Sequence, residues 1–191
     1  MNTYKKIPKK LLYEFEIKHD WLGHDSLLHG VAHMMRTFIL QELICNQLKE
    51  DGVAVNREAT RWASFVHDVG RVDDGHDLDH GRRSAQWMKD NLSQSMSPEL
   101  LDTATYIVHW HVPQDSEAPV MTTELKVLKD ADGLDRVRIG DLNVSYLRTD
   151  AAVGLIETAQ KLYELSQPSS PDEQDSFATV LNAAIRLGLV S

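Results

Sequence analysis

The dipeptide His67-Asp68 places an imidazole beside a carboxylate at the end of the apolar segment Trp62-Ala-Ser-Phe-Val-His-Asp-Val-Gly. Neighbouring residues on a helix point about 100° apart, so the two side chains cannot both face one core. The pair therefore suits a helix end that borders a cleft. Neutral imidazole nitrogen and carboxylate oxygen are ligands for Fe, Mn, Zn or Mg rather than for thiophilic metals. Such a dipeptide also occurs by chance in many proteins, so by itself it indicates a metal site only weakly.

Further candidate ligands lie in other apolar segments. His33 lies on the apolar face of the preceding segment, and His80 opens the segment that follows an Asp-rich loop. His109 lies near the end of the next segment, and Asp132 lies in Asp-Ala-Asp-Gly-Leu, where Asp130 is a competing carboxylate. One such histidine alone more often has a structural role in a core. The whole set, drawn from separate segments, indicates metal binding.

The elements that must position these residues are predicted to be helices, because apolar residues recur at three- and four-residue spacings almost throughout. No segment shows convincing strand-like alternation, so the predicted class is all-α. Asn56 and Ser97 are expected to cap helices, with Pro98 at a first helical position. The predicted helices run from Val31 to about Asp51, Asn56 to Gly70, His80 to about Asn91, Ser97 to His111, Thr123 to Leu134, and over about 149–166 and 173–187.

Composition narrows the class of protein. The 191 residues suit one domain, expected as a helical extension (1–24), a core (25–150) and C-terminal helices packed on it (151–191). The apolar runs are too short for a membrane span, and the basic start is unlike a signal peptide. A net charge of −9 argues against bulk nucleic-acid or anionic-membrane binding. The single cysteine, Cys45, is expected in the core, and the predicted location is cytoplasmic.

The candidates occur in the order His…His-Asp…Asp, through His33, His67, Asp68 and Asp132. This order resembles the HD superfamily of metal-dependent phosphohydrolases. The added histidines resemble its two-metal subset, which includes the HD-GYP phosphodiesterases and the bacterial dinucleoside tetraphosphate hydrolases. Three stretches are also similar to one group of bacterial HD proteins, namely His29–Arg36, His67–Ala85 and Asp130–Thr149. The resemblance covers about residues 25–150 and implies a helical HD-domain bundle.

The resemblance also implies which residues hold metal. A first ion would be held by His33, His67, Asp68 and Asp132. Asp68 would bridge to a second ion held by His80 and His109. In the family, the metal-binding aspartate usually has a hydrophobic residue two positions after it, as Asp132 has in Leu134. Asp132 is therefore preferred to Asp130, which would instead orient a ligand histidine. The implied cofactors are one or two divalent ions such as Fe, Mn, Zn or Mg.

Four residues are predicted to take part in catalysis: Asp68, Arg71, His29 and His111. HD proteins often carry lysine where Arg71 stands; arginine can grip phosphate bidentately but cannot donate a proton near neutral pH. His29, four residues before His33, is expected to contact substrate or shuttle a proton. His111 is expected to be a leaving-group acid or a substrate contact. Arg82 and Arg83 are further candidate cations, or a solvated helix face.

The sequence therefore predicts hydrolysis of a phosphate ester or anhydride in a small phosphorylated substrate, for example a nucleotide. Divalent ions would activate water near neutral pH, and the metals and nearby cations would stabilise the developing charge. Two alternatives stay open. One is a diiron HD-fold oxygenase, which uses nearly the same ligands, and the other is a non-catalytic, metal-stabilised binding module. A homo-oligomer is also left open.

Overall fold

The computed structural model describes residues 5–24, 26, 28–168 and 177–191. Over these residues the chain is helical, which confirms the predicted all-α class. The one extended pairing within them is an isolated bridge between Ile7 and Val190. The first residues of the predicted 173–187 helix, 173–176, lie outside the described part.

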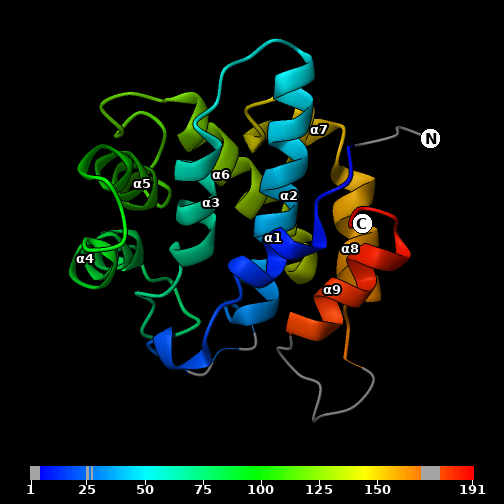
Figure 1. Cartoon of the computed structure of the whole chain (residues 1–191), viewed down its shortest axis with the longest axis horizontal. Coiled ribbons are helices and arrows are strands. Elements are labelled where there is room, and N and C mark those ends of the chain that lie inside the picture. Colours follow the sequence, from blue (N-terminus) through cyan, green and yellow to red (C-terminus); the bar gives the residue numbers. More distant parts are fainter. Residues whose placement is uncertain (1–4, 25, 27, 169–176) are drawn as a thin grey trace.

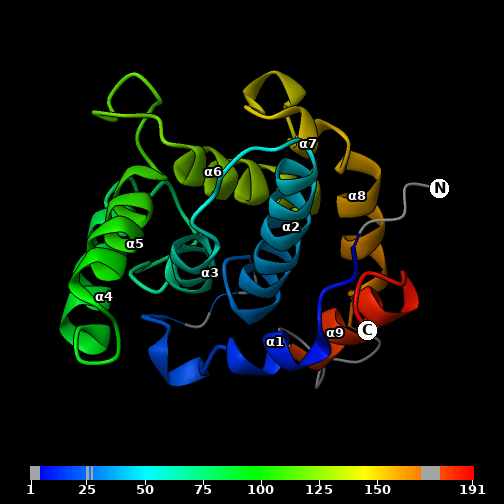
Figure 2. The same ribbon diagram turned by 45° about the horizontal axis from the view of Figure 1, so that its top comes forward.

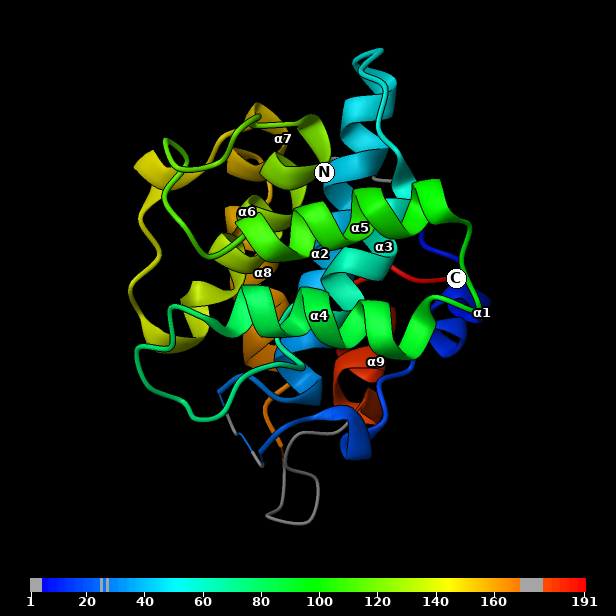
Figure 3. The same ribbon diagram turned by 90° about the vertical axis from the view of Figure 1, so that its left-hand side faces the viewer.

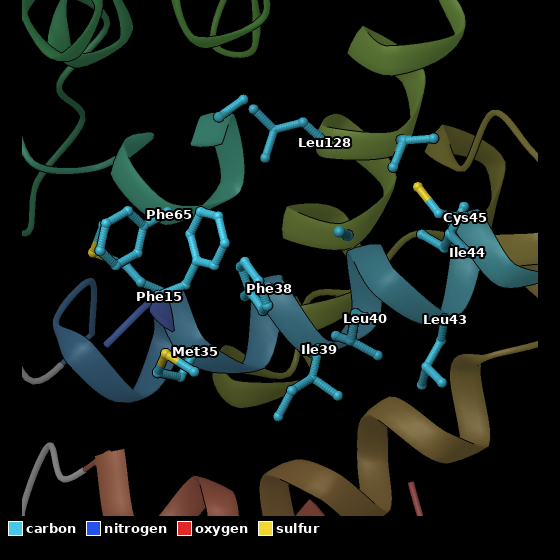
Figure 4. Packing of buried hydrophobic residues seen from close by; sticks show 14 of the residues in the cluster. Phe15, Met35, Phe38, Ile39, Leu40, Leu43, Ile44, Cys45, Phe65 and Leu128 are labelled. Carbon is cyan, nitrogen blue, oxygen red and sulfur yellow. The ribbon is translucent and has the colours of Figure 1, made fainter. Parts of the chain in front are cut away.

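Helix α2 (Val31–Glu50) runs through the middle of the molecule (Figure 1). Its apolar residues point in nearly every direction, and a helix that is apolar all round is stable only when buried all round. The helices packed on it include α3 (Arg57–Val66) and α6 (Thr123–Asp135). Figure 4 shows Phe38 of α2 beside Phe15 and Phe65, and the Phe15 ring centroid lies 5.0 Å from that of Phe38.

Helices α4 (His80–Leu92) and α5 (Pro98–Trp110) lie side by side next to α3 (Figure 3). The predicted caps are present where they were expected. The side-chain oxygen of Asn56 accepts a hydrogen bond from Ala59 N (3.1 Å), and that of Ser97 accepts one from Leu100 N (3.2 Å). These caps satisfy backbone donors that would otherwise lack partners, and so set where α3 and α5 begin.

The segment 149–166 was predicted to be one helix, but in the structure it forms two. It forms α7 (Asp150–Val153) and α8 (Ile156–Leu165), and the break falls at Gly154, whose residue type has a low helix propensity. Helix α8 packs against α6 and α9 (Phe177–Arg186). Short 3-10 turns follow α6, at Arg136–Ile139 and Val144–Tyr146.

The two ends of the described chain meet beside α9 (Figure 2). Ile7 N donates to Leu189 O (2.9 Å), and Ser191 N donates to Ile7 O (3.0 Å). Helix α1 (Lys9–Glu14) and a 3-10 turn at His19–Trp21 then lead towards α2. None of the helices in the described part of the chain has the length and apolar character that crossing a bilayer requires.

Candidate metal centre

Asp68 lies at the centre of a cluster of buried histidines, and each of its oxygens faces a different pair. Helix α3 ends at Val66, four residues earlier than the predicted end at Gly70, so the dipeptide occupies the turn that follows the helix. Asp68 Oδ1 lies 3.1 Å from His80 Nε2 and 3.9 Å from His111 Nε2. Asp68 Oδ2 lies 3.5 Å from His33 Nε2 and 3.8 Å from His67 Nε2. This is the geometry of a bridging carboxylate.

Two sets of potential ligands share this carboxylate. Among the residues that the structure describes, one set is His33, His67 and Asp68, and the other is Asp68, His80 and His111. Within each set the ligand atoms all lie within 4.8 Å of one another. Burial alone would raise the pKa of Asp68, but the surrounding histidines hold that pKa well below its ordinary value. The carboxylate is therefore ionised and able to receive a cation.

The ring orientation of three histidines is set by backbone carbonyls, each from the residue three positions earlier. In each case Nδ1 donates and the carbonyl oxygen accepts: His67 to Ser64 (2.9 Å), His80 to Asp77, and His111 to Val108 (2.6 Å). A carbonyl offers no proton, so these partners assign the hydrogen to Nδ1. With the hydrogen on Nδ1, the Nε2 atom of each ring is the one that faces Asp68 and can act as a metal ligand.

The Nε2 atoms face one another in pairs, at 3.0 Å for His80 and His111 and 3.2 Å for His33 and His67. Two neutral rings cannot hydrogen-bond in this way, because both atoms are acceptors. Burial lowers the pKa of His67 to about 4, so this ring is neutral at pH 7. A divalent cation would receive these lone pairs together with the Asp68 oxygens. The donor set therefore fits the metal that the sequence predicted.

The structure brings His111, and not His109, to this cluster, which corrects the expected second-metal set. His111 is buried, whereas His109 is half-buried and its ring lies against Trp110 (4.7 Å between centroids). Residues two positions apart on a helix point about 200° apart, so His109 and His111 cannot both face the same site. The sequence did contain the signal: Ala104, Val108 and His111 continue one buried stripe at helical spacing.

Of the two aspartates in the Asp-Ala-Asp turn, Asp132 lies at the cluster. Its Oδ1 is 3.4 Å from His33 Nε2, and its side chain is about a third exposed. Asp130 points to the other side of α6, where its carboxylate accepts hydrogen bonds from Arg148 N (2.8 Å) and Thr149 N (2.9 Å). The expectation that Asp130 orients a ligand histidine is therefore wrong. That position belongs to Asp135, which sequence reasoning missed, and which accepts from His33 Nδ1 at 2.8 Å.

Arg71 and His29 lie at the edge of the cluster. Arg71 Nε is 3.2 Å from Asp68 Oδ2, in an ion pair without hydrogen-bond geometry, and this buried nitrogen has no hydrogen-bond partner. The His29 ring stands edge-on to His33 (5.7 Å between centroids), and its Nδ1 lies 3.1 Å from Asp74 Oδ1. Burial lowers the pKa of His29 to about 4, so this ring is neutral at pH 7.

The other two candidate cations are paired with aspartates outside the cluster. Arg82 is exposed and lies 3.2 Å from Asp79. Arg83 forms a hydrogen-bonded ion pair with Asp77, and its Nε donates to Gly70 O at 2.8 Å. For Arg82 the structure supports the solvated helix face, and for Arg83 it supports a role in holding the loop before α4.

The HD-domain family model matches residues 30–137, which is more than half of the chain. The chain therefore belongs to the HD-domain family. Most proteins of this family are metal-dependent phosphohydrolases. No curated protein and no solved structure matches the chain.

Proposed function

We propose that this protein is a metal-dependent phosphohydrolase that acts on a small phosphorylated substrate, for example a nucleotide. The observation that carries the proposal is the buried carboxylate of Asp68, which has a pair of facing imidazole nitrogens on each side. A bridging carboxylate between two nitrogen-rich sets suits two divalent ions rather than one.

We assign the ligands of both ions to buried or partly buried side chains of the cluster. The first ion would be held by His33, His67, Asp68 and Asp132, and the second by Asp68, His80 and His111. When bound, such ions lower the pKa of water and stabilise charge on phosphoryl oxygens. Asp132 is the more exposed ligand, so the first set borders solvent and is the side from which substrate would enter.

Arg71 is proposed as the phosphate contact. Its side chain is 12% exposed, and its unpartnered Nε lies beside Asp68. A guanidinium that is already oriented binds a phosphoryl oxygen without a large loss of side-chain freedom. Because arginine stays protonated, Arg71 would stabilise charge and would not transfer a proton.

His29 is proposed to orient the attacking water or to accept its proton. Its Nδ1 faces the carboxylate of Asp74, so the hydrogen is on Nδ1 and the neutral Nε2 is an acceptor. The low pKa of about 4 keeps that acceptor available at pH 7. His111 is accordingly proposed as a metal ligand instead of a leaving-group acid.

The test is metal analysis joined to a hydrolysis screen. Protein loaded with Mn²⁺ is expected to bind two equivalents and to release phosphate or a nucleotide product from a panel of phosphate esters and anhydrides. Asp68→Ala should lose both bound metal and turnover. Asp79→Ala is the matched control, because Asp79 is an exposed carboxylate paired with Arg82 outside the cluster. Turnover that survives Asp68→Ala would overturn the proposal, and so would two bound irons with substrate-dependent oxygen consumption.

A further inference from the structure

The ring of His33 is held by a different kind of partner from those of the other three histidines of the cluster around Asp68. His67, His80 and His111 lie at helix ends and donate Nδ1 to a nearby backbone carbonyl. His33 lies inside the first turn of α2, where the carbonyl of Gly30 already accepts from Met34 N (3.1 Å). Its Nδ1 donates instead to a side chain on another helix, Asp135 of α6, at 2.8 Å.

The Asp135 carboxylate is held in place by Arg36, one turn after His33 on α2. Arg36 Nε donates to Asp135 Oδ1 (2.6 Å), and its terminal NH2 group donates to Oδ2 (3.0 Å). Burial opposes the charge of Asp135, but the charge of Arg36 outweighs it and lowers the pKa of that carboxyl. Both side chains are buried, so this fork defines one orientation for the carboxylate and, through it, for the His33 ring.

Helix α8 and the residue after it brace the same arginine. The Arg36 guanidinium carbon lies 5.4 Å from the centroid of the Tyr163 ring, and its NH1 group donates to Ser166 Oγ (3.4 Å). Both residues lie beyond positions 30–137, the part of the chain that matches the HD domain. A chain of contacts therefore runs from the C-terminal region through Arg36 and Asp135 to a ligand of the first metal set.

We infer that Asp135 is a positioning residue, which fixes the ring plane and the Nδ1-protonated form of His33 so that Nε2 faces the metal. Helix α8 supports it through Arg36. This inference rests on the metal centre of the proposed function. A carboxylate behind a ligand histidine raises ligand basicity as well as fixing its direction, and its loss costs about 10–100-fold in metal affinity.

The test compares Asp135→Asn with Glu42→Gln in the full chain, titrated with Co²⁺. Glu42 is the matched control: it is buried on α2 and is held by Arg61 (2.8 Å) and Arg57 (2.6 Å), away from the cluster. Asp135→Asn is expected to weaken one of the two Co²⁺ equivalents by about 10–100-fold, with a changed visible absorption spectrum for that ion. Glu42→Gln should lower the melting temperature but leave both affinities unchanged.

A second variant keeps the test decisive if Asp135→Asn does not fold. Arg36→Lys keeps the charge but loses the fork, so we expect the same ion to weaken by less than in Asp135→Asn. The inference is overturned if a variant that folds binds both ions with wild-type affinity and only its melting temperature falls, as in Glu42→Gln. That result would show a purely structural role. The proposed function fails separately, if the wild-type protein binds no metal at all.

Discussion

The Nε2 atoms of His80 and His111 lie 3.0 Å apart, although His80 begins α4 and His111 follows α5. The Nδ1 atom of each ring donates to a backbone carbonyl, so a neutral ring has no hydrogen on Nε2 to donate to the other. Each ring is held by a carbonyl behind it, so the close approach is imposed by the fold. Such a contact is stable when a cation or a proton lies between the two nitrogens. In the proposed enzyme this is the place of the second metal ion.

The first prediction separates the two histidines of the Tyr106-Ile-Val-His-Trp-His segment. His111→Ala should remove one of two bound metal equivalents and lower hydrolysis by at least about 100-fold, because a metal ion contributes several kcal/mol to the transition state. His109→Ala should change neither quantity, since its ring packs on Trp110 outside the cluster. Metal analysis and initial rates measure both. Equal losses in the two variants would contradict the assignment of His111.

The second prediction concerns Gly81, which allows α4 to approach the end of α5. A Cβ at this position would lie 2.9 Å from Val108 O and 3.0 Å from His109 O, both backbone atoms. Gly81→Ala should therefore destabilise the protein by about 1–3 kcal/mol and separate His80 from His111. Urea denaturation and metal stoichiometry test this.

The control for Gly81 is Gly154→Ala. A Cβ there meets backbone oxygens only at 3.6 Å, and its φ of −66° suits any residue. We expect this variant to be unchanged or more stable by up to about 1 kcal/mol. If Gly81→Ala behaved in the same way, the close approach would not be what brings the second set of ligands together.

The third prediction distinguishes substrate binding from metal binding. Arg71→Ala should lower kcat/KM by roughly 10–100-fold, since hydrogen bonds to charged groups contribute about 1.5–3 kcal/mol. Bound metal should remain at two equivalents, because Arg71 offers no ligand atom. Arg82→Ala, which removes an exposed arginine paired with Asp79, should leave the rate unchanged. Loss of metal in Arg71→Ala would show that this arginine supports Asp68 and not the substrate.

The fourth prediction is a pH dependence of stability that comes from Asp115, away from the cluster. A hydrogen bond from Arg148, with one from Lys129, lowers the pKa of Asp115 from 3.8 to about 2. A lowered folded-state pKa stabilises the protein above pH 3.8, and this contribution is lost as the pH falls towards 2. Because the side chain is 42% exposed, the contribution should be no more than about 1 kcal/mol.

Denaturation of wild type and Asp115→Asn at pH 7 and at pH 2 measures this contribution. The variant should be less stable at pH 7, and the difference should shrink at pH 2, where about half of the wild-type carboxyl groups are protonated. A difference of the same size at both values would mean that the ion pairs with Arg148 and Lys129 contribute nothing that depends on charge.

Much of the fold was predictable from local patterns. Helical periodicity and the caps at Asn56 and Ser97 identify helices one at a time, because these signals depend on neighbouring residues alone. The same local signals placed His67-Asp68 at a helix end, and residue type alone indicated a metal that prefers nitrogen and oxygen. The subdivision into three regions, the cytoplasmic location and the oligomeric state stay predictions.

Tertiary structure decided what local patterns could not. The choice of His111 over His109 depends on which face of α5 meets α4, and the different roles of Asp130 and Asp132 depend on how α6 is rotated against α2. The position of Asp135 behind His33 depends on contacts between residues about a hundred positions apart. Residues a few positions apart on one helix have nearly the same sequence neighbours, so local patterns do not distinguish them. Their side chains nevertheless point in different directions, and only the packing of the helices determines which of them enter the site.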